Sequence, residues 1–254
     1  ALIAPVARIL GVKHYQWYAH TTLSRYLRWS RMWVNGIITS TSGSCPITGK
    51  KVFPIGQAII PESFGFIARQ GNKLTKALHV GRFDPSKDIY LLAETCRKIS
   101  ENGIPISFTQ IGDPTTDLAK RYAKSFELEY ADLIEDQVIL VRPSILRSEI
   151  VSYMAVNDFF IHAYVGSLDK TLIEATLSGL PVITLNPEYQ SQFGTWSGLT
   201  NPSLYSEYIA LKNFGISELN IELERRRLIC ESEHSLENWT RKLTTILSKG
   251  ELGR

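Results

Sequence analysis

The residues best suited to chemistry lie together in one short stretch of the C-terminal half. Residues 166–170 read Gly-Ser-Leu-Asp-Lys, and Glu174 follows one helical turn after Lys170. A glycine-led loop that enters a helix presents backbone N–H groups and the positive end of the helix dipole, and both attract an anion. Lys170 adds positive charge, and the Glu174 carboxylate can accept hydrogen bonds from two neighbouring hydroxyl groups. A phosphate at the loop and a diol at the glutamate together describe a nucleotide.

The segments on either side of this stretch predict one βαβ unit. Residues 158–163 and 181–184 are short apolar runs, typical of buried strands in a parallel sheet. A helix is predicted over 171–178, and Gly179 occupies the place of a C-terminal helix cap. Every such crossover has a loop before its helix, so plain α/β architecture is the alternative to nucleotide binding.

Part of this unit resembles a known sequence signature. Asp-Lys-Thr-Leu-Ile-Glu-Ala at 169–175, followed by Gly-Leu-Pro-Val at 179–182, resembles the donor-binding signature of family-4 glycosyltransferases with the GT-B fold, in the variant of bacterial surface-polysaccharide enzymes. That signature has two glutamates with seven residues between them. Glu174 matches the second glutamate, and Gly166 stands in the place of the first. The resemblance implies that the donor contacts Ser167, Leu168, Asp169, Lys170 and Glu174.

A cationic loop follows the predicted strand at 77–80. Val80-Gly81-Arg82 leads to Lys87, and an arginine and a lysine so placed can clamp a diphosphate, Arg82 through two hydrogen bonds and Lys87 as a point charge. In a doubly wound sheet such a loop lies at the carboxyl edge, where ligands bind. These residues also match the diphosphate-binding element of the resembled family. A solvated loop with surface charges is the alternative.

Two further candidates end predicted strands. Gly112 follows the strand at 104–111, where a glycine either lets a ligand approach the backbone or forms a plain turn. Arg142 follows the strand at 137–141. In the resembled family this stretch borders the nucleobase, which implies a contact from Arg142; an exposed arginine before a proline is the alternative.

His20 is the candidate catalytic residue of the N-terminal part. It ends a predicted strand over 12–19 and so lies at a carboxyl edge. The resembled family has a histidine in this place, beside the donor sugar and the acceptor. A histidine that caps the next helix or bonds a backbone carbonyl is the alternative. His162, inside the strand at 158–163, is predicted to be a packed core residue.

Composition narrows the classes of function. The chain has 254 residues, 44% of them hydrophobic and 21% charged, as in ordinary globular proteins. The net charge of +3 is too small to indicate a nucleic-acid partner, and no apolar run is long enough to span a membrane. Three cysteines without metal-ligand spacing predict a reduced, cytoplasmic protein. No Asp-x-Asp motif occurs, so no metal or other cofactor is expected, and the nucleotide sugar serves as a co-substrate. No Gly-x-Gly-x-x-Gly follows a predicted strand, which argues against a dinucleotide oxidoreductase.

The elements predict an α/β fold with two Rossmann-like parts. Strands are predicted at 77–80, 104–111, 137–141, 158–163 and 181–184, and helices at 85–99, 115–126, 147–155 and 171–178. This alternation indicates one complete doubly wound, GT-B-like donor domain. The shorter N-terminal part, with strands at 12–19, 36–40 and 51–56, resembles the C-terminal part of a second Rossmann-like domain whose beginning is absent. The predicted organisation is a remnant of the acceptor-binding domain at 1–60, a linker at 61–75, the donor-binding domain at 76–230 and a C-terminal helix at 231–254.

The predicted function is transfer of a sugar from a nucleotide-diphosphate sugar to a glycan or lipid-linked glycan acceptor. The resemblance implies a retaining, hexosyltransferase-type reaction without metal, with the positive charges balancing the leaving diphosphate. A non-catalytic nucleotide-sugar binding or regulatory subunit is the alternative, because Gly166 has no carboxylate.

A helix predicted over 23–34 bears on location. Arg25, Arg28, Trp29 and Met32 are placed on one face of it, which suits the surface of an anionic membrane at its inner side. The solvated face of an ordinary surface helix is the alternative.

Overall fold

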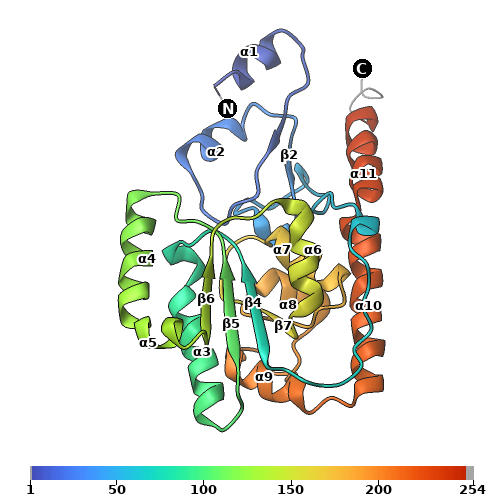
Figure 1. Cartoon of the computed structure of the whole chain (residues 1–254). Coiled ribbons are helices and arrows are strands. Elements are labelled where there is room, and N and C mark those ends of the chain that lie inside the picture. Colours follow the sequence, from blue (N-terminus) through green and yellow to red (C-terminus); the bar gives the residue numbers. More distant parts are fainter. Residues whose placement is uncertain (1, 250–254) are drawn as a thin grey trace. The chain divides into compact units, whose positions relative to one another are not determined.

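The structure, a computed structural model, describes residues 2–249 and contains two compact units, each built on a parallel β-sheet (Figure 1). The first unit comprises residues 2–61, 166–170 and 229–249 of the described chain, and the second comprises 62–165 and 171–228. The predicted α/β class is therefore confirmed.

The second unit contains a five-stranded sheet in the order β6-β5-β4-β7-β8. The strands are β4 Lys76–Val80, β5 Ser107–Ile111, β6 Ile139–Arg142, β7 Phe159–His162 and β8 Val182–Thr184. In chain order this is 3-2-1-4-5, the order of a Rossmann-like sheet, and its winding reverses between β4 and β7. Ligands of such sheets bind beside that reversal, at the carboxyl ends of the strands.

Helical segments connect these strands and follow the last of them. They are η3 Pro85–Lys87, α3 Ile89–Glu101, α4 Asp117–Glu129, α5 Ala131–Glu135, α6 Arg147–Val156, α7 Lys170–Leu177, α8 Pro187–Phe193, α9 Leu204–Lys212 and α10 Ile216–His234. The four helices predicted between the strands are confirmed, with ends shifted by a few residues. Gly179 follows α7 with a φ of +71°, as a C-terminal glycine cap requires.

Both faces of the second sheet are covered. Phe159 and Ile161 of β7 pack in one core cluster with residues of α3, α4 and α9. Phe160 and His162 point to the opposite face because side chains alternate along a strand, and they are also fully buried. Such two-sided burial is characteristic of parallel sheets and explains the unbroken apolar runs in the sequence.

The first unit contains a smaller parallel sheet in the order β1-β2-β3. Its strands are β1 Tyr15–Trp17, β2 Gly36–Thr39 and β3 Val52–Pro54, and its helical segments include α1 Ala4–Ile9, α2 Arg25–Ser30, η1 Ser42–Ser44 and α11 Leu236–Lys249, with η2 Pro61–Ser63 at the boundary between the units. Pro54 lies on a strand that pairs with β2 alone among the described strands, which is the place where a sheet tolerates proline.

The C-terminal helices complete the first unit. Ile59 accepts a hydrogen bond from Leu236 N at 2.7 Å, and Ile59 N donates to the His234 carbonyl at 2.9 Å. Gly56 has a φ of +93°, and a Cβ there would lie 2.2 Å from the Glu233 carbonyl oxygen. The chain after β3 therefore pairs with the break between α10 and α11, and only glycine permits this approach.

Two predicted helices differ from the structure. α2 spans only Arg25–Ser30, and Ser24 caps it by accepting a hydrogen bond from Leu27 N, so Met32 lies beyond the helix and not on its basic face. The sequence predicts a helix over 222–229, and α10 extends well beyond it because its buried residues recur at helical spacing from Leu219 to Cys230. The sequence predicts a loop over 190–202, whereas α8, capped by Asn186, continues to Phe193 and so occupies the start of that segment. Among the described residues, none of the helices combines the length and apolar content needed to cross a bilayer.

Candidate functional site

The loop after β4 carries both predicted diphosphate-binding cations, in different surroundings. Arg82 is exposed, whereas Lys87 is buried and its ammonium lies 4.0 Å from the centroid of the Tyr164 ring. An aromatic face attracts a cation, and more strongly where water is excluded. The loop lies at the carboxyl end of β4, beside the reversal of the sheet, where a ligand is expected.

Two aspartates fix the shape of this loop. Asp84 accepts hydrogen bonds from Ser86 N at 3.0 Å and Ser86 Oγ at 2.6 Å, and the side-chain bond lowers the pKa of Asp84. Asp88 takes a φ of +49° and caps α3 by accepting from Leu91 N at 3.3 Å. Both carboxylates are therefore used to hold the turn that positions Lys87.

Gly112 permits the loops after β4 and β5 to meet. It has a φ of +138°, and a Cβ there would lie 2.1 Å from the Gly81 carbonyl oxygen. The same Gly81 oxygen accepts a hydrogen bond from Gln110 Nε2 at 2.9 Å, and Gln110 Oε1 lies 2.6 Å from His79 Nδ1. Gly112 is therefore approached by the backbone of the neighbouring loop, at Gly81 and Arg82.

The loop after β6 is tied to the same edge. Arg142 is exposed, and its carbonyl accepts a hydrogen bond from Gly112 N at 3.0 Å. Asp113 N donates to Ser144 Oγ at 3.1 Å, and Ser144 N donates to Asp113 Oδ2 at 3.0 Å. Three consecutive βα loops of the second unit are therefore linked by backbone and side-chain hydrogen bonds.

Glu174 is fully buried within α7, and its Oε1 accepts a hydrogen bond from Arg147 Nη2. Arg147 is the first residue of α6, and its side chain is 60% exposed. A buried carboxylate is costly unless it is paired, so this guanidinium stabilises the ionised form that could accept hydrogen bonds from a diol. The pair joins two helix starts at the carboxyl edge of the sheet.

Arg147 is the functional candidate that the sequence analysis missed. The signal that could have found it is topological. In a parallel sheet every βα unit begins its helix at the same edge, so an arginine that opens α6 and a glutamate one turn into α7 share that edge.

The predicted donor loop, Gly166–Lys170, clusters with the first unit although β7 and α7 flank it in the chain. Leu168 is buried; its N–H donates to Ser44 Oγ at 3.2 Å, and its carbonyl accepts from Gln57 Nε2 at 2.5 Å. Ser44 and Gln57 follow β2 and β3, so the loop is held at the carboxyl edge of the first sheet. The backbone groups of Leu168 are used in this anchoring.

The first unit also contains the predicted site residues His20, Ser167, Asp169 and Lys170. His20 follows β1, is exposed, and lies edge-on to Tyr18 with ring centroids 5.7 Å apart. Ser167 and Asp169 are half-buried, and Lys170 is exposed. The second unit holds the remaining predicted residues: Arg82, Lys87, Gly112, Arg142 and Glu174. His162 is fully buried and its Nδ1 lies 3.0 Å from Thr184 Oγ1, which confirms it as a core residue.

Within residues 2–249, no group of three or more His, Cys, Asp or Glu side chains is placed to hold a metal ion. The three cysteines are buried and not disulfide-bonded.

Comparison with known proteins gives matches in structure only. No protein-family model matches the sequence, and a search of curated proteins gave no match either. The chain is similar to Anabaena Alr3699/HepE, solved in complex with UDP-glucose, with a TM-score of 0.77 and 13% identity over 97% of this chain and 75% of that one. It is also similar to a glycosyltransferase from Rickettsia africae, with a TM-score of 0.74 and 13% identity over 98% of this chain and 79% of that one.

A third similar structure is a mutant of S. aureus TarM, solved in complex with fondaparinux, alpha-GlcNAc-glycerol and UDP. The TM-score is 0.69 at 14% identity over 92% of this chain, which spans half the length of TarM (50%). Identities of this size show a common fold. The chain therefore has a GT-B-like fold, built from two Rossmann-like parallel-sheet units.

Proposed function

We propose that this protein is a glycosyltransferase that moves a sugar from a nucleoside diphosphate sugar to an acceptor. The observation that carries the proposal is the carboxyl edge of the second sheet. There the buried Glu174 is paired with Arg147, and the loop after β4 presents Arg82 and Lys87 beside the reversal between β4 and β7. UDP or UDP-glucose is bound in several structures of similar fold, so UDP-sugars are the first donors to test.

In this proposal each residue has a distinct role. Glu174 accepts hydrogen bonds from the ribose hydroxyls, and Arg147 keeps its carboxylate ionised and oriented. Arg82 and Lys87 bind the diphosphate and stabilise the charge that develops on it as the bond to the sugar breaks. Because these cations supply positive charge, the proposed reaction proceeds without a metal ion.

Further roles follow from the family-4 resemblance. His20 is proposed to contact the sugar or the acceptor, and Arg142 the nucleobase. Ser167, Asp169 and Lys170 are proposed to contact the donor sugar or its phosphates. The proposed reaction retains the anomeric configuration of a hexosyl donor, and the acceptor is a glycan or lipid-linked glycan of polysaccharide biosynthesis.

We also propose that the protein works at the cytoplasmic face of an anionic membrane. Arg25 and Arg28 are exposed on α2, and the neighbouring Arg31 and Met32 are exposed directly after it. Cationic side chains near an anionic leaflet each contribute about 1 kcal/mol of attraction.

A second candidate function is donor binding without transfer. Gly166 favours it, because a glycine stands where the resembled signature has its first glutamate. Both candidate functions use the same donor site, and only the first includes turnover of the donor.

The test combines binding and turnover. Thermal unfolding of the chain with UDP, UDP-glucose and UDP-N-acetylglucosamine should show a raised melting temperature for the bound nucleotide. Release of UDP from a UDP-sugar, faster with a glycan acceptor than with water, would establish transfer. Binding without UDP release would favour the second candidate. Absence of any effect from nucleoside diphosphates or their sugars would reject both.

A further inference from the structure

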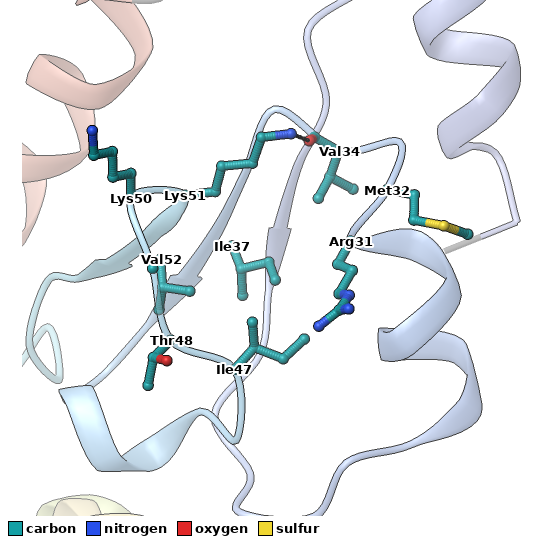
Figure 2. A pocket seen from close by; sticks show the side chains of 10 residues that line it. Arg31, Met32, Val34, Ile37, Ile47, Thr48, Lys50, Lys51 and Val52 are labelled. Atoms are coloured by element: carbon teal, nitrogen blue, oxygen red, sulfur yellow. Dashed lines mark hydrogen bonds between the residues drawn. The ribbon is translucent and has the colours of Figure 1, made fainter.

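A separate cavity of about 270 Å³ lies in the first unit (Figure 2). It is lined by residues from the end of α2, the start of β2 and the segment that enters β3: Arg31, Met32, Val34, Ile37, Ile47, Thr48, Gly49, Lys50, Lys51 and Val52. These segments precede their strands, so the cavity lies at the amino edge of the sheet. Ser44 and Gln57, which hold the predicted donor loop, follow their strands and lie at the opposite edge.

The lining combines an apolar wall with cations. Ile37, Ile47 and Val52 form part of the wall, and Figure 2 shows the Arg31 guanidinium directed toward Ile47. Lys51 Nζ donates to the Val34 carbonyl at 3.4 Å, which holds it at the margin. The lining contains three cationic side chains and no carboxylate. Such a lining is suited to a ligand with one anionic end and one apolar end.

The lining comes from a part of the chain without acidic residues, although the same unit also contains Asp169, Glu231, Glu233 and Glu237. Residues 1–61 contain seven lysines and arginines and no aspartate or glutamate, although the whole chain has 25 acidic residues: Arg8, Lys13, Arg25, Arg28, Arg31, Lys50 and Lys51 are the seven. The Lys13 ammonium, just before β1 at the same edge, is buried and has no hydrogen-bond partner among the described residues. A local excess of one charge concentrates ligands of the opposite sign.

We propose that this cavity binds a phosphate monoester with an alkyl substituent. Arg31 holds the phosphate, with Lys51 at the margin, and Ile37, Ile47 and Val52 contact the first carbons of the chain; Lys50 points away from these side chains (Figure 2). Ligand pockets usually have volumes of roughly 300–1,000 Å³, and this cavity is slightly smaller, so it suits a head group and short tail better than a whole nucleotide sugar. The proposal is independent of the donor site, which involves other residues.

Isothermal titration calorimetry on the full chain tests it with three probes: hexyl phosphate, inorganic phosphate and hexanol. Hexyl phosphate should bind saturably and at least about tenfold more tightly than either fragment, because only it engages both the cations and the apolar wall. Arg31→Gln with Lys51→Gln should weaken hexyl phosphate binding by about tenfold or more. Val52→Thr, which keeps the side-chain shape, should weaken hexyl phosphate and leave inorganic phosphate unchanged.

The matched control is Arg25→Gln with Arg28→Gln, which removes the same charge from α2 outside the cavity. It should leave hexyl phosphate affinity within about twofold. Equal losses in both double variants, inorganic phosphate binding as tight as hexyl phosphate binding, or no saturable binding would overturn the proposal. Urea unfolding checks that the variants remain folded.

A further experiment, with lipid vesicles, identifies the source of the ligand. Co-sedimentation with phosphatidic acid vesicles that hexyl phosphate displaces would assign the cavity to a lipid head group. Binding of hexyl phosphate without such displaceable co-sedimentation would assign it to a dissolved phosphate ester. Either result supports the proposed chemistry.

Discussion

The guanidinium of Arg147 donates a hydrogen bond to the carboxylate of Glu174, linking the first residue of α6 to a buried position in α7. Glu174 is fully buried, whereas Arg147 is largely exposed. The pair therefore differs both from an ion pair on the surface and from an ion pair in the core. Loss of the arginine leaves a buried carboxylate without its cation, and the exposure of Arg147 allows water to compensate in part.

Arg147→Ala should therefore lower the free energy of unfolding by about 1–3 kcal/mol and weaken UDP binding. Arg147→Lys should recover part of both, because it restores the charge without the planar geometry. Urea unfolding and calorimetry measure the two effects. Arg121→Ala, an exposed arginine of α4, is the control and should change neither. A stable Arg147→Ala protein with native UDP affinity would remove Arg147 from the site.

Substitutions of Arg82 and of Lys87 should differ in their effect on stability, although both should weaken UDP binding. Arg82→Ala should weaken UDP binding by about 1.5–3 kcal/mol without loss of stability, because the side chain is exposed and its proposed role is to bind the ligand. Lys87→Met should also cost about 0.5–2 kcal/mol of stability, because its ammonium lies over the face of the Tyr164 ring. Uridine is the control ligand, since it lacks the diphosphate. Equal losses for uridine and UDP would contradict the assignment of Arg82.

Gly112→Ala should destabilise the protein through both strain and collision. The φ of +138° disfavours any side chain, and the new Cβ would meet the Gly81 carbonyl. We expect a loss of about 2–4 kcal/mol in urea unfolding, together with weaker UDP binding. Gly103→Ala is the matched control, because Gly103 has a φ of +79° and open space around it. A similar cost at both positions would mean that contact with Gly81 adds nothing.

Stability should depend on pH through His234. Burial lowers the pKa of His234 from 6.5 to about 4, and the charge of Lys242 also lowers it against the opposite effect of Glu233. The unfolded chain therefore binds a proton between about pH 6.5 and pH 4 that the folded chain does not. This contribution is present in full above pH 6.5 and is lost as the pH falls, by up to about 3 kcal/mol.

Unfolding free energies at pH 7.5, 6 and 4.5 measure this effect. His234→Asn should flatten the dependence. An unchanged slope in the His234 variant would assign the dependence to other groups.

Membrane binding should depend on salt and on α2. Anionic vesicles should sediment the protein at low salt and less of it at high salt, because exposed cations act through screened attraction. Arg25→Glu with Arg28→Glu should weaken this binding by about 100-fold or more, at about 1 kcal/mol for each charge removed and a similar repulsion for each charge added. Arg121→Glu with Lys124→Glu on α4 makes the same charge change as a control. Neutral and anionic vesicles that bind alike would exclude the proposal.

The second sheet could be predicted almost completely from the sequence, because its strands are buried on both faces. Runs such as 158–163 have no polar alternation, and glycine or proline follows within a few residues of most of them. α8 and the full length of α10 could not be predicted, since α10 carries charged residues on most of its surface and only a narrow buried stripe. The pairing of Arg147 with Glu174 depends on distant parts of the chain, which local patterns do not reveal. The anchoring of Leu168 by Ser44 and Gln57 depends on them too.

The pairing of Ile59 with Ser235 brings early and late residues of the chain into the same unit. It therefore determines which unit can be completed first during synthesis. The second unit is complete once residue 228 has left the ribosome, whereas the first unit waits for 229–249. Until α11 emerges, Trp17 lacks its neighbour Trp239, and Tyr15 lacks the Ile246 carbonyl that its hydroxyl bonds. The strands of the first unit are thus made before those of the second, but the first unit gains its last contacts after the second unit has gained its own.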